Sequence, residues 1–371
     1  MAAGSLHGCR RALSSRRRSR ARPRDPDGHR RGRSPPLSRR GRHRHRLGPR
    51  ARAGRVLAQD RGAAPRTRRG GGIRAAAVLV WLNGRWLAAR QARVSALDRG
   101  LLHGDGVYDT WRTYGGHSFA VATHMRRLAA AARRLGLPPP GPPALWERRS
   151  RLLVARSGLP DAAVRLTLTR GAAGDTLVPE GRARPTLLLT ARRLPKDLAA
   201  RQRDGVRVVL LPFPRDTVAP WGWLKLIGHP SAVLGRSTAA RRGAAEGLYV
   251  NAAGEVTEAT TANVFIRERD AVVTPPLSAG ILPGVTRALV LDLARRAGLT
   301  IREEPIPITR LRRAREVFLT ASTIEILPVV RLGARRVGEG QPGTTTRLLQ
   351  ARYAWHVDRA MRRVANAARV R

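Results

Sequence analysis

The chain has 371 residues, of which 72 are Lys or Arg and 25 are Asp or Glu, so its formal net charge is +47. This length allows two domains of ordinary size. A single cysteine, Cys9, excludes an intrachain disulfide and a cysteine-based metal site, and we expect no bound metal. No apolar run is long enough to span a bilayer, so we expect a cytoplasmic protein without membrane contact.

Residues 1–77 differ in character from the rest of the chain. They contain 24 Arg against three Asp, a net charge of +21, with no aromatic residue and no helical or strand period. Such a composition cannot bury enough apolar surface to fold, so we expect a disordered basic tail.

Three interpretations of the tail are open. Arg runs displace phosphate counterions, so the tail could be a nucleic-acid-binding arm. It also has the Arg-rich, acid-poor composition of a transit peptide. The third interpretation, which we favour, is GC-rich upstream DNA translated from a start codon placed too early, because the tail lacks the aromatic groups that single-strand binders use.

Residues 78–195 are predicted to form a small N-terminal α+β domain. Strands are expected where apolar residues alternate or run together between turn signals, at 78–86, 107–114, 118–120, 164–169 and 185–191. The first range contains an Asn-Gly pair and is expected to be a hairpin. Helices are expected at 123–135, with Thr123 as the N-cap, and at 143–157.

Residues 196–204 are polar and are predicted to be a linker, which leaves 205–371 as a larger C-terminal α/β domain. The same patterns predict its strands, at 206–212, 248–250, 255–258, 263–267, 271–274, 317–320 and 329–332. Its helices are expected at 231–243, 283–298 and 345–370, and the last of them is strongly basic.

Lysine is the rarest basic residue of the chain, with only Lys196 and Lys225 present. A lysine amine can lose its proton and form a Schiff base, which a guanidinium cannot do. Lys225 lies in the apolar run Trp-Leu-Lys-Leu-Ile, which favours an uncharged amine, whereas Lys196 lies in a polar turn. The alternative is that codon bias removed lysine generally and left two residues by chance.

An enzyme that uses pyridoxal phosphate (PLP) also needs an acid for the pyridine nitrogen and a phosphate site. Glu258 ends a predicted strand among small residues, although it could equally be an exposed carboxylate. Free N–H groups at the helix start near Gly284, with the hydroxyl of Thr286, could bind phosphate; the alternative is an ordinary helix start. The hydroxyls of 320–323 and the charge of Arg127 could contribute, but Arg127 could also be a surface residue of an Arg-rich chain.

Several segments, in their order, resemble the class IV aminotransferases, the fold-type IV PLP enzymes that include branched-chain and D-amino-acid aminotransferases and aminodeoxychorismate lyases. The matching stretches are Leu-Asn-Gly, Ala-Leu-Asp-Arg-Gly-Leu-Leu-His-Gly-Asp-Gly-Val-Tyr-Asp-Thr, His-Met-Arg-Arg-Leu, Thr-Arg-Gly, Leu-Lys-Leu, Thr-Glu-Ala-Thr-Thr-Ala-Asn-Val-Phe, Thr-Pro-Pro-Leu, Gly-Ile-Leu-Pro-Gly-Val-Thr-Arg and Phe-Leu-Thr-Ala-Ser-Thr. The resemblance covers about residues 79–353. Each motif alone is weak, but this many in the right order are specific.

The resemblance implies a two-domain fold-type IV enzyme that binds pyridoxal 5'-phosphate, forms a homodimer and moves an amino group between a branched-chain or D-amino acid and a 2-oxo acid by a ping-pong Schiff-base mechanism. It implies that Lys225 is the Schiff-base lysine and proton carrier and that Glu258 pairs with the pyridine nitrogen. The other residues it implies bind phosphate (Arg127, Val285, Thr286, Ser322 and Thr323), pack on the ring (Leu282) or contact substrate (Tyr108 and Arg170).

Three departures from the family pattern concern substrate preference more than cofactor binding. Asp109 stands where the family commonly has Glu, Ala259 where Gly often follows the acid, and Leu-Ile-Gly-His-Pro follows Lys225. An aminodeoxychorismate lyase, which eliminates pyruvate on the same scaffold, is therefore a second hypothesis. A nucleic-acid-binding protein is a remote third, because the +26 outside the tail is spread rather than striped.

Overall fold

The computed structural model describes residues 78–369 except 175, 182–183 and 215–220, so every prediction about residues 1–77 lies outside the described part. The described residues belong to one compact unit. Within them, no helix combines the length and the apolar character that a bilayer span requires.

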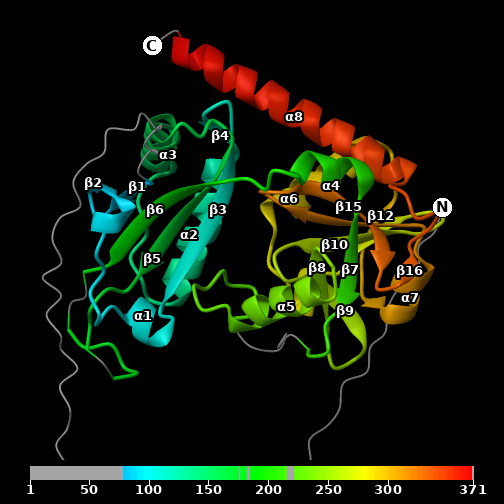
Figure 1. Ribbon diagram of the computed structural model, residues 1–371, viewed down its shortest axis with the longest axis horizontal. Helices are drawn as coiled ribbons and strands as arrows, with labels where there is room; N and C mark the ends of the chain where they lie inside the picture. The colour runs from blue at the N-terminus through cyan, green and yellow to red at the C-terminus, as the bar shows by residue number, and fades with distance from the viewer. Residues whose placement is uncertain (1–77, 175, 182–183, 215–220, 370–371) are drawn as a thin grey trace, which may run out of the picture. The chain divides into compact units, whose positions relative to one another are not determined.

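The N-terminal part of this unit is a six-stranded antiparallel sheet in the order β2-β1-β6-β5-β3-β4 (Figure 1). Its strands are β1 Leu79–Leu82, β2 Arg85–Ala88, β3 Gly106–Tyr114, β4 His117–Ser118, β5 Ala162–Thr169 and β6 Thr186–Arg193. The helices of this part are η1 Ala89–Gln91, α1 Arg99–His103, α2 Val121–Arg134 and α3 Pro143–Ser157.

The predicted hairpin at 78–86 is confirmed and has the turn that its sequence demands. Asn83 and Gly84 adopt φ of 46° and 94°, which is the left-handed pair of a type I′ turn. The core of this part lies between the sheet and α2 and α3, where Trp111, Leu128 and Trp146 are completely or almost completely buried. Burial of these large side chains holds the helices on the sheet.

The C-terminal part is built on a ten-stranded mixed sheet in the order β12-β11-β10-β14-β15-β7-β8-β9-β13, with β16 paired to β15. Its strands are β7 Val206–Leu210, β8 Glu246–Val250, β9 Glu255–Ala259, β10 Asn263–Arg267, β11 Val272–Thr274, β12 Ile301–Glu303, β13 Ile306–Pro307, β14 Glu316–Ala321, β15 Glu325–Leu332 and β16 Arg335–Arg336. Its helices are α4 Leu198–Asp204, α5 Pro230–Arg241, η2 Leu277–Ala279, α6 Val285–Arg296, α7 Ile308–Arg313 and α8 Thr344–Arg369.

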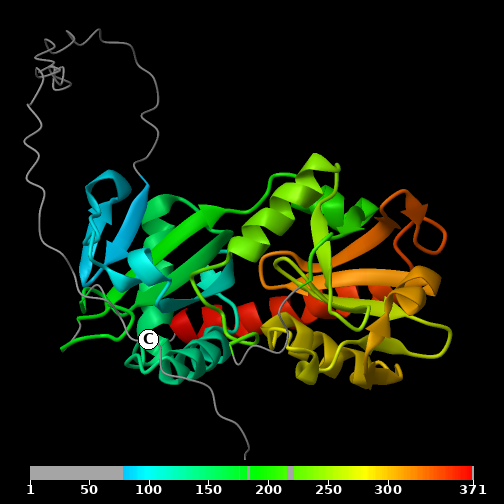
Figure 2. The same ribbon diagram turned by 90° about the horizontal axis from the view of Figure 1, so that it is seen from below.

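Two helices, α6 and the long α8, pack together against this sheet (Figure 2). Between them and the sheet lies a core that contains Phe265, Phe318, Val290, Leu349 and Tyr353. The rings of Phe265 and Phe318 stack with their centroids 4.9 Å apart. This core fixes the position of α6, whose N-terminal end points to the site described below.

Two local details differ from the predictions. Thr123 does not cap α2, because the helix begins at Val121 after Ala120, which is at φ 55° and provides no side-chain cap. The segment predicted as a linker at 196–204 contains α4, which Gln202 anchors by donating to Ile324 O at 3.0 Å. The division into domains at 78–195 and 205–371 stays a prediction.

Candidate active site

Nine of the ten predicted site residues line one cavity of about 470 Å³, which we call the active-site cavity. Its walls come from both sheets. The predicted residues that line it are Tyr108, Arg127, Lys225, Glu258, Leu282, Val285, Thr286, Ser322 and Thr323. Its volume lies in the range that holds a cofactor or a small ligand, which is about 300–1,000 Å³.

Lys225 is held in place by the edge of β3. Its carbonyl accepts a hydrogen bond from Tyr108 N at 2.9 Å, and the neighbouring Leu226 forms a β-bridge with Val107. Leu224 and Leu226 face the core on either side, so alternation along this extended segment turns Lys225 the other way, into the cavity. There its Nζ lies 4.7 Å from the ring centroid of Tyr108.

Glu258 is a buried carboxylate, not the exposed strand end that was the alternative. It lies near the end of β9, with only 5% of its surface exposed. Its Oε2 accepts hydrogen bonds from Leu282 N at 3.0 Å and from Asn263 Nδ2 at 3.2 Å. These two donors fix the orientation of a carboxylate in the cavity wall.

The N-terminal end of α6 supplies the third part of the site. Its N-cap is Gly284, and no side chain caps the helix, so the first N–H groups, at Val285 and Thr286, remain available to an anion. A Cβ at Gly284 would collide with the side-chain amide of Asn263. Glycine is thus needed for the helix to begin this close to the residue that holds Glu258.

A chain of buried polar groups connects Arg127 to Ser322. Arg127 donates to Asp109 through Nε at 2.9 Å and Nη2 at 2.8 Å, and to Pro283 O through Nη1 at 2.9 Å. The ring of His124 lies between Asp109 Oδ1, 2.9 Å from Nδ1, and Ser322 Oγ, 3.2 Å from Nε2. Asp109 and His124 are almost fully buried, so this chain holds Arg127 and Ser322 rigidly at the cavity.

Electrostatics keep Asp109 ionised. Burial alone would raise the pKa of its carboxyl, but the charges and hydrogen bonds of Arg127 and His124 outweigh burial and hold that pKa well below its usual range. Burial lowers the pKa of His124, and Arg127 and Lys225 lower it further, while Asp109 opposes the shift. A neutral His124 therefore bridges the carboxylate and the serine at neutral pH.

The wall formed by β3, β5 and β6 carries two arginines, Arg165 and Arg192. Neither forms an ion pair within the described residues. The guanidinium carbon of Arg165 lies 3.6 Å from the ring centroid of Tyr108. Burial lowers the pKa of Arg165, and the charge of Arg192 lowers it further. Two cations that share a wall without a carboxylate form a surface suited to an anionic substrate.

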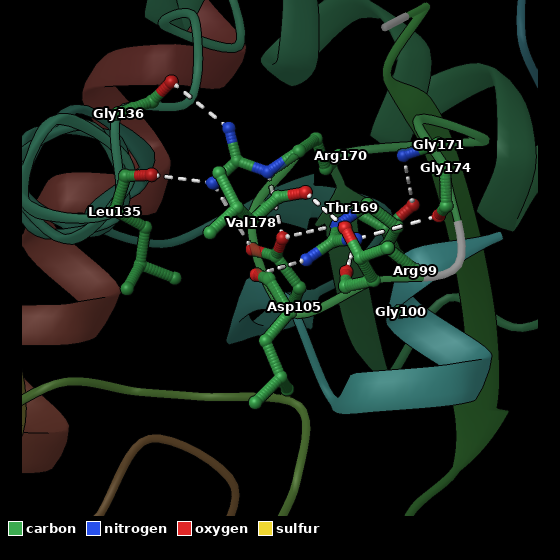
Figure 3. Close-up of polar contacts among 12 residues, drawn as sticks. Arg99, Gly100, Asp105, Leu135, Gly136, Thr169, Arg170, Gly171, Gly174 and Val178 are labelled. Carbon is green, nitrogen blue, oxygen red and sulfur yellow. Dashed lines mark hydrogen bonds and ion pairs between the residues drawn. The ribbon is translucent and has the colours of Figure 1, made fainter. Parts of the chain in front are cut away.

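Arg170 is the predicted residue that the structure does not bring into the cavity. It donates to Asp105 through Nε at 2.6 Å and Nη2 at 3.2 Å, and to the carbonyls of Leu135 and Gly136 just after α2 (Figure 3). Arg99 also pairs with Asp105, at 3.1 Å. These contacts give Arg170 a role in fixing the end of α2, and the geometry offers no support for a contact with substrate.

Five important residues of the site were not predicted. Asp109 was noted only as a departure from the family pattern, and His124 only as part of the stretch His-Met-Arg-Arg-Leu. Asn263 had a signal, since it follows Glu258 closely in the chain and an amide can hold a carboxylate. Arg165 and Arg192 had none, because the chain contains 72 basic residues.

The described residues fit pyridoxal phosphate. The cavity offers an amine at Lys225, a buried carboxylate at Glu258 and the free N–H groups of α6. It also contains the Thr320 hydroxyl, which is buried and makes no hydrogen bond within the described residues, and which a polar ligand could satisfy. No group of His, Cys, Asp and Glu side chains in the described residues could hold a metal ion.

Comparison with known proteins gives a consistent result. The family model for amino-transferase class IV matches residues 106–332. A provisionally named branched-chain-amino-acid aminotransferase of Methanocaldococcus jannaschii is 32% identical over 281 residues, which cover 74% of this chain and 94% of that one. The D-alanine aminotransferase of Bacillus licheniformis is 30% identical and covers 73% and 94%.

Solved structures agree with this result. The branched-chain amino acid aminotransferase of Escherichia coli superposes with a TM-score of 0.69 at 26% identity, covering 74% of this chain and 92% of that one. The corresponding enzyme of T.th., solved with pyridoxamine 5'-phosphate, has a TM-score of 0.68 at 26% identity and covers 74% and 93%.

Proposed function

The chain belongs to the class IV aminotransferases, and we propose that its active-site cavity binds pyridoxal 5'-phosphate and transfers an amino group from an amino acid to a 2-oxo acid. The observation that carries this proposal is that Lys225, Glu258 and the N-terminal end of α6 line a single cavity. The cofactor needs an amine, an acid and an anion site, and each of the three is present there.

The roles of the residues follow from their chemistry. Bound pyridoxal phosphate supplies a pyridinium ring that withdraws electrons from the substrate Cα. Lys225 holds the cofactor covalently through its amine and, once released by the amino donor, accepts the proton from the substrate Cα. Glu258 holds the proton on the pyridine nitrogen, and Arg127 and Thr286 bind the phosphate dianion.

The two arginines of the wall bear on the substrate. Arg165 and Arg192 lie on neighbouring strands, with Arg165 paired to Thr190 and Arg192 paired to Ala163 across β5 and β6. Two guanidinium groups suit a substrate with a carboxylate on this side. This supports an amino acid and a 2-oxo acid as substrates, with a second carboxylate on at least one of them. Branched-chain and D-amino acids are the donors to test first.

The lyase remains a second candidate because the same wall suits aminodeoxychorismate, which carries two carboxylates. The aminodeoxychorismate lyase of Bacillus subtilis is 29% identical over 281 residues. A single-turnover experiment separates the two. A lyase releases pyruvate without an amino acceptor, whereas a transaminase converts the donor to an oxo acid and leaves the cofactor aminated.

The test of the proposed function uses the two lysines of the chain. We expect borohydride reduction of the enzyme with pyridoxal phosphate to attach the cofactor to Lys225, as peptide mass spectrometry would show. Lys225→Ala should abolish the attachment and turnover, whereas Lys196→Ala, the matched control, should leave both unchanged. Normal turnover by Lys225→Ala would remove this residue from the mechanism.

We also propose that the enzyme is a homodimer, as its resemblance to the family implies. The segment around α1 supports this, because Leu97, Leu101 and Leu102 expose 61%, 71% and 44% of their surface. Exposed apolar residues that gather in one segment are typical of a protein interface. Sedimentation velocity measures the association state directly.

A further inference from the structure

A second cavity, of about 700 Å³, lies in the C-terminal part and shares no lining residue with the active-site cavity. We call it the arginine cavity. Its described lining includes five arginines and no Asp or Glu, and the arginines are Arg207, Arg242, Arg312, Arg331 and Arg335. They come from β7, α7, the end of α5 and the β15–β16 hairpin. In both views, β16 and α7 lie on the side of the ten-stranded sheet opposite the six-stranded sheet (Figures 1 and 2).

These five arginines lack the carboxylate partners that many other arginines of the chain have. Arg310, for example, pairs with Glu268 at 2.7 Å and with Glu304 at 2.8 Å. Within the described residues, no ion pair involves any of the five, and Arg331 donates only a long bond of 3.4 Å to Ala334 O. The positive charge of the cavity is therefore not neutralised by the protein.

The strand register concentrates this charge. Arg331 is the direct partner of Arg207 on β7 and of Arg336 on β16. Like charges directly opposite each other destabilise a sheet, and an anion bound between them removes that cost. Arg207 also leans toward the end of α5, since a Cβ on Gly243 would lie 3.8 Å from its Nη1.

Two of the five arginines have another explanation. Arg242 is the C-cap of α5 and Arg312 lies in the last turn of α7, where the helix dipole favours a cation. The argument therefore rests on Arg207 and Arg331, which are paired in the sheet. Their floor is apolar and consists of Val209, Leu210 and Leu332.

We propose that the arginine cavity is a second binding site, for a polyanion with at least two phosphate groups. Guanidinium groups bind phosphate oxygens in pairs, and several of them converge here. A single phosphate would fill a small part of a cavity of about 700 Å³, whereas a triphosphate chain reaches several guanidinium groups at once. Inorganic tripolyphosphate and a nucleoside triphosphate share this chemistry, and the apolar floor could in addition hold a base.

The test measures each arginine separately, because the basic tail also attracts polyanions. The full chain is first loaded with its cofactor, so that the phosphate site of the active-site cavity is filled. It is then treated with p-hydroxyphenylglyoxal, which modifies accessible guanidinium groups, over a range of tripolyphosphate concentrations. Mass spectrometry gives the protection of Arg207, Arg331 and Arg335, with the exposed Arg133 and Arg134 of α2 as the reference.

We expect tripolyphosphate to protect the cavity arginines at concentrations at least about tenfold below those that protect Arg133, since several charged hydrogen bonds form together. The double variant Arg207→Gln/Arg331→Gln should weaken protection of Arg335 by at least about tenfold. The matched variant Arg133→Gln/Arg134→Gln should leave it unchanged. Both variants should keep wild-type turnover.

Comparison of probes identifies the source of the phosphates. Tighter protection by ATP than by tripolyphosphate assigns the site to a nucleotide, and equal protection assigns it to the phosphate chain alone. Either result supports the proposal. It is overturned if orthophosphate protects as well as tripolyphosphate, if Arg133 is protected in parallel with Arg331, or if the double variant protects Arg335 normally.

Discussion

Two buried carboxylates of the active-site cavity region, Glu258 and Asp109, have different partners and therefore different functions. Glu258 accepts from the amide groups of Leu282 and Asn263 and lines the cavity. Asp109 is ion-paired with Arg127 at 2.8 Å and bonded to His124. The first is placed to interact with a ligand, and the second holds the residues that bind it.

Replacement of Glu258 by Gln should reduce turnover while covalent cofactor attachment persists. A neutral amide cannot hold a proton on the pyridine nitrogen, and loss of such electrostatic support costs about 3–4 kcal/mol in the barrier. Steady-state kinetics and the absorbance of the bound cofactor measure the two effects. Glu255→Gln, on the same strand but outside the cavity, is the control. Activity within a few-fold of wild type would exclude Glu258 from the mechanism.

Replacement of Asp109 by Asn should destabilise the protein in a pH-dependent way. The pKa of Asp109 is held well below its usual range, so its ion pair stabilises the fold above the unfolded pKa and is lost as the pH falls toward the folded one. We expect a loss of about 3–5 kcal/mol in the free energy of unfolding at pH 7, because Arg127 stays buried without its partner.

Urea unfolding at several pH values measures this effect. The difference between wild type and Asp109→Asn should shrink below about pH 4, where the wild-type carboxyl begins to take up its proton. The control Asp358→Asn removes an exposed pair on α8 and should cost no more than about 1 kcal/mol. A difference that stays constant from pH 7 to pH 3 would refute the role given to the charge of Asp109.

At this scale the sequence predicted the ligand-facing residues better than their supports. Ordered motifs identified nine of the lining residues, since each motif lies next to the ligand. His124 and Asp109 lie on a helix and a strand, and only the packing of α2 on β3 brings them to 2.9 Å. The same reasoning misplaced Arg170, because no local pattern reveals its pairing with Asp105.

Among the elements, α6 connects the fold to the site. Its C-terminal half is fixed by the core that contains Val290, Leu293 and Ala294, and its N-terminal end approaches the cavity at Gly284. The predicted apolar stripe included Val285 and Leu289, which are only partly buried. The stripe was misplaced because the first turn of α6 faces the cavity and not the core.

Replacement of Gly284 by Ala should weaken cofactor binding by at least about tenfold. The added Cβ would collide with the amide of Asn263, which must move away from Glu258 or push the helix end out of the cavity. Equilibrium dialysis with pyridoxal phosphate measures the affinity.

Gly298→Ala, just beyond the other end of α6, is the matched control. Gly298 has φ 73° and free space around its Cβ position, so the variant should lose about 1 kcal/mol of stability and keep its affinity. Equal loss of affinity in both variants would mean that helix stability, and not the Asn263 contact, governs binding.

Sequence patterns predicted the long helices and the hairpin strands well but not the short elements. α3 begins and ends as predicted, at Pro143 and Ser157, because a Pro run and a Gly bracket it. β12, β13 and α7 have only a few residues each, too few to show a period. α4 was missed because its fixed position depends on contacts with β15.

Over the whole molecule, charge and fold are divided between different parts of the chain. Residues 1–77 carry +21 of the net charge of +47, whereas both sheets, the active-site cavity and the family match at 106–332 lie beyond them. The sequence could predict this division from composition alone, because a change from Arg-rich to periodic apolar segments needs no tertiary information.

A chain that starts at Val78 should therefore match the full chain in melting temperature, cofactor content and turnover per folded molecule. Its affinity for nucleic acid should fall, and the slope of log affinity against log salt concentration should become shallower, because that slope follows the number of phosphates that cations neutralise. Calorimetry, kinetics and a salt series with a random DNA duplex measure these properties. A chain shortened in this way that fails to fold or loses its cofactor would show that the first 77 residues stabilise the enzyme. An unchanged salt slope would mean instead that the +26 of the remaining residues accounts for the attraction.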